Sequence, residues 1–192
     1  MNSRIKKIKR CDWAGDDPLY CAYHDNEWGV PCHDDRKLFE MLVLEGFQAG
    51  LSWITILRKR ENFRKAFHHW DWNKIARYGP KDVERLMHDP GIVRNRLKIQ
   101  AAINNARAFI KVREEFGTFA AYMWRFTNNT TVRRYPRARR FKDLPTHSPH
   151  SDAMSRDLKK RGFSFVGTVI CYAHMQAVGM VDDHLEGCWK AV

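Results

Sequence analysis

The sequence predicts an all-α protein, and three features of the chain point to this class. From Asp34 onward, apolar residues recur three and four positions apart, the spacing that gives a helix one apolar face. Strand signals are weak and limited to short stretches such as residues 130–132. No internal repeat or low-complexity linker divides the 192 residues, which fits one domain. We expect residues 11–192 to form that domain, with two helical lobes around a cleft, and residues 1–10 to be a basic, flexible tail.

The helices follow in order from their apolar faces and their end signals. The apolar faces are expected at Leu38, Met41 and Leu42; at Leu51, Ile54 and Leu57; at Ile99, Ala102, Ile103, Ala106 and Ile110; and at Val166, Val169, Ile170, Ala173 and Ala177. A Gly-Pro stop at 79–80 precedes a short helix over residues 81–87. Ser151 is a suitable N-cap for a later helix that Gly162 ends, and Gly179 ends the last helix.

The charge balance narrows the class of partner. Lys and Arg number 34 against 22 Asp and Glu, which gives a formal net charge of +12. Such a balance favours a polyanion, with nucleic acid first and an acidic membrane surface second. No apolar stretch approaches the length of a membrane span, and the basic N-terminus runs into polar sequence without a signal-peptide core. We expect a cytoplasmic protein, associated with the nucleoid if it acts on DNA.

The five cysteines are an odd number without an export signal, which argues against a disulfide framework. Cys11 with His24, and His184 with Cys188 one helical turn later, would make a tetrahedral Cys2His2 set with no open position, which is typical of structural zinc. One such ion would join both ends of the chain and contribute on the order of several kcal/mol. The alternative, unrelated histidines and buried thiols, fits the spacing equally well. Three other cysteines are expected to be ordinary buried or half-buried thiols: Cys21, Cys32 and Cys171.

Residues 87–99 have the order expected of a helix-hairpin-helix: a helix end, a Pro-Gly turn and a basic helix start. Backbone N–H groups of such a turn, with the N-terminus of the next helix, can hold a phosphate. The expected DNA contacts are Gly91, Ile92, Val93, Arg94, Arg96 and Lys98. A second phosphate track is conceivable along Arg133, Arg134, Arg137, Arg139, Arg140 and Lys142. In both places the alternative is a solvated basic surface.

Glu45 is the most unusual side chain of the sequence, because it ends the apolar run 41–44 in a segment that is hydrophobic nearly all round. A buried carboxylate without a partner is costly and is rarely kept unless it is used. Five aromatic residues with polar tips lie in the same third of the chain: Trp13, Tyr20, Tyr23, Trp28 and Trp53. Aromatic rings stack on nucleobases at roughly 1–3 kcal/mol per base and attract cations. The pattern predicts a pocket for an extruded base. Core packing is the alternative, and we accept it for Trp70, Trp72 and Trp124.

Four stretches together resemble the 3-methyladenine DNA glycosylase I family. They are RCDWAGDDPLYCAYHDNEWGVP, LFEMLVLEGFQAGLSWITILRKRENFRKAF, DPGIVRNRLKIQAAINNARA and LKKRGFSFVGTVICYAHMQAVGMVDDHLEGC. The similarity runs in the expected order from about Arg10 to Cys188 and is more specific than any single motif. It implies the all-α helix-hairpin-helix glycosylase fold, with a zinc site joining the N- and C-terminal segments.

The resemblance also implies roles for individual residues. The zinc ligands would be Cys11, His24, His184 and Cys188. Glu45 would be the active-site carboxylate that reads 3-methyladenine, with Tyr23 and Trp53 lining or stacking in its pocket. Further aromatic positions around that pocket would be Trp13, Tyr20 and Trp28. The loop from Gln48 to Leu51 would approach the gap left by a flipped nucleotide.

The hairpin departs from the pattern of many related glycosylases. The second glycine of the P-G-x-G turn is Val93, and the lysine of enzymes that also cleave the strand is Asn95. The chain has no aspartate between Asp89 and Asp143, where most members carry a catalytic one. These differences argue against a Schiff-base lyase and against aspartate-assisted departure of a neutral base.

The expected function is therefore monofunctional excision of 3-methyladenine from alkylated double-stranded DNA by base flipping, with one structural zinc ion and the chain as a monomer. Alkylation at N3 makes the base cationic and weakens its glycosidic bond, so Glu45 is expected to act as an ionised recognition group rather than as an acid. The alternative is a non-enzymatic, zinc-clasped binder of damaged or structured nucleic acid. A metal-dependent hydrolase would need an open metal position that the sequence does not offer. Acceptance of 3-methylguanine and the side chain that fills the vacated stack stay open.

Overall fold

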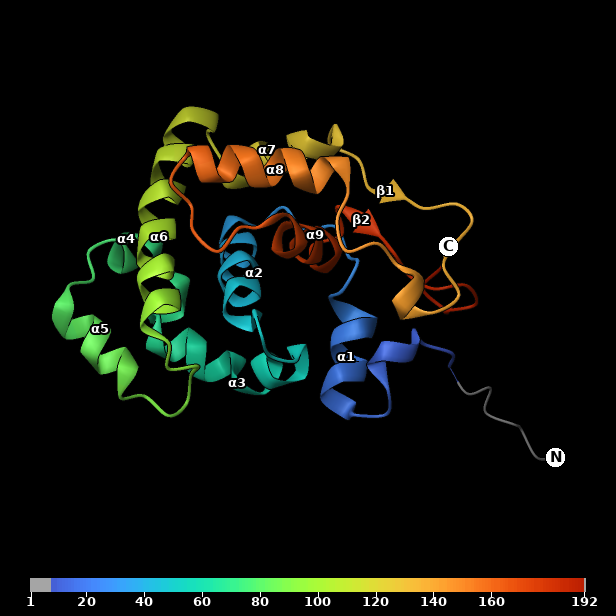
Figure 1. Ribbon diagram of the computed structural model, residues 1–192, viewed down its shortest axis with the longest axis horizontal. Helices are drawn as coiled ribbons and strands as arrows, with labels where there is room; N and C mark the ends of the chain where they lie inside the picture. Colours follow the sequence, from blue (N-terminus) through green and yellow to red (C-terminus); the bar gives the residue numbers. More distant parts are fainter. Residues whose placement is uncertain (1–7, 192) are drawn as a thin grey trace.

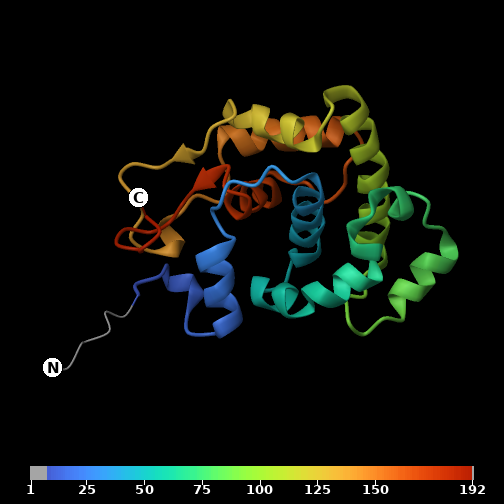
Figure 2. The same cartoon turned by 180° about the vertical axis from the view of Figure 1, so that it is seen from behind.

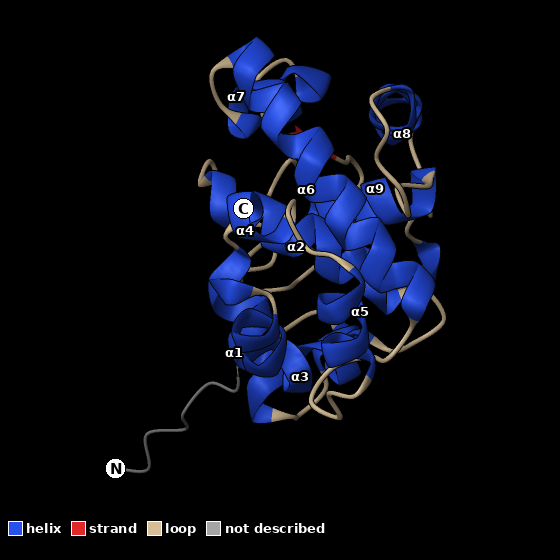
Figure 3. Cartoon of the chain, turned by 90° about the vertical axis from the view of Figure 1, so that its left-hand side faces the viewer, coloured by secondary structure: helices blue, strands red, loops and turns tan. Residues whose placement is uncertain are grey.

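Helices dominate the structure, a computed structural model that describes residues 8–191 (Figure 3). The α-helices are α1 (Pro18–Asn26), α2 (Asp35–Gln48), α3 (Trp53–Ala66), α4 (Trp72–Ile75), α5 (Pro80–Met87), α6 (Arg96–Phe116), α7 (Phe119–Trp124), α8 (Pro149–Lys160) and α9 (Thr168–Ala177). Short 3-10 turns are η1 (Asp12–Ala14), η2 (His68–Trp70), η3 (Arg125–Thr127) and η4 (Phe141–Asp143). The all-α prediction is confirmed. None of the described helices is long and apolar enough to cross a membrane.

Helix α2 lies at the centre of the molecule, with α3, α6 and α9 around it (Figures 1 and 2). It begins at Asp34, whose carboxylate accepts a hydrogen bond of 2.7 Å from the Lys37 N–H. Every residue from 38 to 47 is buried, as a sequence that is apolar nearly all round predicts. Two glutamates are therefore carried into the interior on this helix, Glu40 and Glu45.

Several helix ends follow the sequence signals, and one does not. Pro80 opens α5 after Gly79, and Gly162, with a φ of +89°, ends α8 as predicted. The N-cap predicted at Ser151 is wrong. Helix α8 begins one turn earlier because Ser148 caps it and Pro149 occupies its first position, while Ser151 completes a capping box with Ser148.

Two predicted apolar faces also differ from the structure. Leu51 precedes α3, which starts at Trp53, and its side chain is 41% exposed. Val169 lies in the first turn of α9 and is 55% exposed. The buried face of α9 is formed instead by Cys171, Tyr172, Met175 and Gln176 among others. Simple spacing misses this because α9 is packed on more than one side after its first turn.

The two ends of the described chain meet on one side of the molecule (Figure 1). Strand β1 (Val132–Arg133) pairs in parallel with β2 (Val181–Asp182), the only sheet within residues 8–191. The basic cluster that follows β1 is tied to carboxylates rather than arrayed as a free track. The pairs are Arg133–Asp182, Arg134–Asp183, Arg137–Asp182, Arg139–Glu186 and Arg140–Asp143.

The tail predicted over residues 1–10 lies mostly outside the described residues. Its last two residues, however, contact the folded part of the chain. The Lys9 carbonyl accepts a hydrogen bond of 2.9 Å from the Trp189 N–H. Arg10 donates to both carboxylate oxygens of Asp25, at 2.7 to 3.0 Å. Residues 9 and 10 therefore pack against the folded part of the chain.

Candidate active site and metal centre

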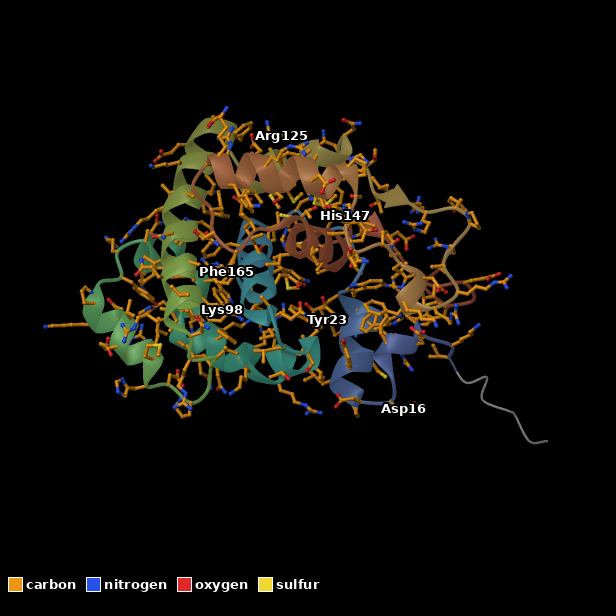
Figure 4. The ribbon with its side chains drawn as sticks, in the orientation of Figure 1. Asp16, Tyr23, Lys98, Arg125, His147 and Phe165 are labelled. Carbon is orange, nitrogen blue, oxygen red and sulfur yellow. The ribbon has the colours of Figure 1, made fainter. Side chains whose placement is uncertain are left out.

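A cavity of about 290 Å³ brings together all the residues predicted for base recognition. Its predicted lining residues are Trp13, Tyr20, Tyr23, Trp28, Glu45, Gln48 and Trp53. The sequence did not predict four others: Ser52, Phe141, Ala173 and Gln176. The cavity lies between the N-terminal segment, α2, the start of α3 and α9, and Figure 4 shows Tyr23 on the side of α1 that faces this region.

The aromatic wall follows from local folding of the N-terminal segment. Asp17 caps α1 by accepting from the Leu19 and Tyr20 N–H groups, and helical spacing then places Tyr20 and Tyr23 on one face. The preceding turn η1 presents Trp13, whose ring centroid lies 5.0 Å from that of Tyr20. Tilted and edge-on packing of this kind holds the rings rigidly. The wall is therefore formed before any ligand enters.

Glu45 is 4% exposed, and its Oε2 has no hydrogen-bond partner among the described residues. The indole nitrogens of Trp13 and Trp53 are buried and unpartnered in the same way. Buried polar atoms are nearly always hydrogen-bonded in folded proteins. One unpaired acceptor and two unpaired donors around one cavity therefore match a flat, polar ligand.

Burial raises the pKa of Glu45 to about 8. Its carboxyl is consequently mostly protonated at neutral pH in the ligand-free site, whereas the sequence led us to expect an ionised carboxylate. The physical reason is that none of the described cations offsets the loss of hydration. A cationic ligand would supply that charge and favour ionisation.

A larger cleft of about 500 Å³ lies elsewhere, over the outer side of α2 and α3. Its central charges are already matched. The Arg60 side chain donates to Glu40 at 2.8 Å and to Glu27 at 2.9 Å, and Arg64 donates to Glu40 at 2.9 Å. These charged groups therefore satisfy one another, unlike Glu45 in the smaller cavity, whose Oε2 has no partner among the described residues.

The four predicted metal ligands meet at one buried point. Donor atoms of Cys11, His24, His184 and Cys188 all lie within 4.8 Å of one another. The sulfur-to-nitrogen distances are 3.5 Å between Cys188 and His24, and 3.7 and 3.8 Å from His184 to the two sulfurs. A tetrahedral zinc ion with ordinary bond lengths needs edges of about 3.5 Å. The donor set therefore fits such an ion, and the four residues are not unrelated, as one interpretation of the sequence had it.

The environment of the cluster also suits a cation. The His24 Nδ1 lies 2.8 Å from the Asp25 carboxylate, which orients the ring so that Nε2 faces the cluster. The neighbouring Cys11 thiol and the two imidazoles lower the pKa of Cys188, whereas the Cys188 thiol and burial raise the pKa of Cys11. A divalent cation would stabilise the thiolate form of both cysteines.

The metal cluster and the aromatic wall share a boundary. The Trp13 ring centroid lies 5.2 Å from that of His24, and the Trp28 ring meets His184 edge-on at 4.7 Å. Two sides of the cavity are thus packed directly on two of the candidate ligands.

Known proteins resemble this chain both in sequence and in structure. Residues 13–191 match the family model for methyladenine glycosylase. The chain belongs to this family. It is 54% identical over 181 residues to DNA-3-methyladenine glycosylase 1 of Escherichia coli (strain K12), covering 94% of this chain and 96% of the relative. It is therefore a glycosylase enzyme.

Two solved structures agree with the family assignment. A crystal structure of 3-methyladenine DNA glycosylase I superposes with a TM-score of 0.91 at 54% identity and covers 95% of this chain and 99% of that one. A tyrosine-to-phenylalanine variant of 3-methyladenine DNA glycosylase I, solved in complex with 3-methyladenine, superposes with a TM-score of 0.89 at 35% identity and covers 95% and 97% of the two chains.

In this methyladenine glycosylase the hairpin predicted for DNA contact connects α5 and α6. Arg94 and Arg96 are exposed at its surface, and Arg96 pairs with Glu84 at 2.8 Å. Ile92 is buried, so it anchors the turn from inside. The Gly91 N–H donates to the Asp89 carboxylate at 2.7 Å, so this N–H already has an acceptor within the turn.

Lys98 has a different role from the phosphate contact expected of it. It is 8% exposed, and burial lowers its pKa. Its ammonium donates to the carbonyl oxygens of Phe47 at 2.8 Å and Ala49 at 2.6 Å, at the end of α2. Figure 4 shows Lys98 between α6 and α2. Because a lysine at this place holds the last carbonyls of α2, it fixes the loop from Gln48 to Leu51 instead of a phosphate.

We expect Lys98→Met to lower the free energy of unfolding by about 2–4 kcal/mol, because the buried carbonyl oxygen of Phe47 and the partly buried one of Ala49 would both lose their donor. Urea unfolding measures this change. Arg96→Met is the matched control on the same helix, and we expect a change of less than about 1 kcal/mol there, since its ion pair is exposed. Equal losses in the two variants would contradict the positioning role of Lys98.

Two of the residues that line the cavity were not predicted from the sequence, and the reasons differ. Gln176 lies one turn after Ala173, a position predicted on the buried face of α9, so helical spacing contained a partial signal for it. Phe141 comes from the long loop after β1, where its backbone N–H donates to Asp12 at 3.2 Å. No local pattern indicates which loop residue will reach a distant cavity.

Proposed function

We propose that this protein hydrolyses the N-glycosidic bond of 3-methyladenine in alkylated double-stranded DNA, after flipping the damaged nucleotide into the aromatic cavity. The observation that carries the proposal is the unpaired Oε2 of Glu45 inside a cavity of about 290 Å³ lined by tryptophan and tyrosine rings. The names of the relatives and the 3-methyladenine complex of one of them support the same substrate.

The chemistry of the leaving group determines what the site has to do. Methylation at N3 gives the purine a positive charge, so the base departs as a neutral molecule and needs no protonation. The aromatic faces attract the cation. Glu45, neutral in the empty site, releases its proton to water when the cation enters, and its carboxylate then accepts a hydrogen bond from the exocyclic amino group. Selectivity then depends on how readily a base leaves the stack and how well it fits these groups.

The same residues support hydrolysis without strand cleavage. A lyase step needs a lysine amine free to attack the sugar. The lysine position of strand-cleaving relatives is Asn95 here, and the Lys98 ammonium is held by two carbonyl oxygens. Water is therefore the nucleophile in this proposal.

The metal centre has a structural role in the proposed mechanism. Cys11, His24, His184 and Cys188 would hold one zinc ion, and four protein ligands leave no position for a reacting water. We further propose that the chain acts as a monomer, with residues 11–192 as one domain whose exposed hairpin contacts the DNA backbone.

Release of free base tests this function against the non-enzymatic binder. The protein is incubated with N-methylated duplex DNA, and the supernatant is analysed chromatographically. We expect free 3-methyladenine to appear while the DNA strands stay intact until they are heated in alkali. Unmethylated duplex is the control and should release no adenine. Binding of methylated duplex without any released base would instead establish the binder.

A further inference from the structure

Gln176 lines the proposed base cavity but has no assigned role. It lies on α9, is 9% exposed, and shares the cavity with Glu45. Its Nε2 donates to the Asp183 Oδ2 at 2.8 Å. A buried amide held in this way turns its NH2 group toward Asp183 and its carbonyl oxygen in another direction.

The carboxylate of Asp183 determines how the Gln176 amide is oriented. Asp183 is 2% exposed, and the Tyr172 hydroxyl also donates to its Oδ2, at 2.6 Å. Because this oxygen accepts both hydrogen bonds, the NH2 group of the Gln176 amide is turned toward Asp183. The Arg134 side chain lies 3.7 Å from the other carboxylate oxygen of Asp183.

The carbonyl end of Gln176 is therefore directed away from Asp183. Asp183 lines a separate cavity with Arg134 and Tyr172. Gln176 lines the base cavity and also donates a hydrogen bond to Asp183, whereas Asp183, Arg134 and Tyr172 do not line that cavity. No described residue donates to its Oε1.

We propose that Gln176 is a specificity-determining residue whose Oε1 is a second acceptor, beside Glu45, for the base in the cavity. This inference rests on the proposed function and extends it to the choice among alkylated purines. An exocyclic amino group carries two hydrogens and can donate to both acceptors. An oxo group carries none and would face two oxygen atoms. The pocket thus selects 3-alkylated purines with a 6-amino group and disfavours their 6-oxo counterparts, such as 3-methylguanine.

Asp183 acts in this scheme as a positioning residue. Its Oδ2 accepts from the Gln176 NH2 group and so keeps the amide from rotating by half a turn, which would turn a donor toward the base. A site built around a fixed acceptor discriminates strongly, because a ligand without the matching hydrogen leaves buried polar atoms unpaired.

The test measures released 3-methyladenine and 3-methylguanine from the same methylated duplex. We expect Gln176→Met to lower kcat/KM for 3-methyladenine about tenfold, the value of one lost hydrogen bond, and to raise the ratio of 3-methylguanine to 3-methyladenine. Gln100→Met is the matched control, because Gln100 is exposed on α6, and it should leave both rates unchanged.

Asp183→Asn is the second variant. It tests the orientation of the Gln176 amide independently if the Gln176→Met protein folds poorly. An asparagine can donate or accept, so the Gln176 amide becomes free to rotate, and we expect the same ratio to rise although Gln176 is intact. Melting temperature and bound metal are measured on each protein. Unchanged ratios in both folded variants would overturn the inference, whereas absence of released base from the unaltered protein would overturn the proposed function.

Discussion

Glu45→Gln is expected to reduce release of 3-methyladenine about 100-fold or more while leaving the protein folded. Glutamine fits the same space but cannot become an anion, so the cationic base loses an ionic hydrogen bond worth roughly 3 kcal/mol. Single-turnover kinetics on methylated duplex measure the loss. Glu45→Ala should be at least as impaired. Near-normal excision by both variants would remove Glu45 from the mechanism.

The same substitution should stabilise the empty protein, and the direction follows from the pKa of Glu45. Its pKa is about 8 in the folded protein against 4.5 for an unperturbed glutamate. A raised carboxyl pKa means that the folded state holds the proton more tightly, so this stability is complete below pH 4.5 and is lost as the pH rises to about 8. At pH 7 the loss is on the order of 3 kcal/mol, and a glutamine does not incur it.

Thermal melting between pH 5 and pH 9 tests this trade between stability and function. We expect the melting temperature of the unaltered protein to fall with pH relative to that of Glu45→Gln. Glu40→Gln is the control on the same helix, and it should destabilise, because Glu40 is paired with Arg60 and Arg64. Parallel melting curves for Glu45→Gln and the unaltered protein would contradict the buried, unpaired state of Glu45.

Cys188→Ser is expected to lose the bound metal and to lower the melting temperature by about 10 °C, because an ion joining both ends of the chain contributes several kcal/mol. Metal content by elemental analysis and thermal melting measure the two effects. Cys21→Ser is the matched control, since Cys21 is only half-buried and lies outside the cluster. Equal metal content and equal melting temperatures would refute the clasp.

The structure adds an expectation for catalysis by the metal-free variant. Cys188 does not line the cavity, so the identity of the released base should not change. The rate should nevertheless fall, because Trp13 and Trp28 pack on His24 and His184. A variant that releases a different set of bases would show that the cluster also determines recognition.

Chemically unusual residues were the most predictable part of this protein. Glu45 and the aromatic rings could be predicted because each departs from what its surroundings favour. The four candidate metal ligands followed from the family resemblance, since their spacing alone fitted unrelated residues equally well. Lys98 shows the limit of such reasoning. A lysine at the start of a basic helix can bind either a phosphate or a carbonyl oxygen, and the sequence pattern is the same in both cases. Only the position of α2 in the fold shows that carbonyl oxygens are its partners. The Asp183–Gln176 pair depends in the same way on how the C-terminal segment folds back.

The origin of the metal ligands has a consequence for biosynthesis. Cys11 and His24 are synthesised well before His184 and Cys188. Before His184 has been synthesised, Trp13 can already pack on His24, but Trp28 lacks its contact with the His184 ring. We therefore expect the pocket to be incomplete in a nascent chain that has not reached residue 188.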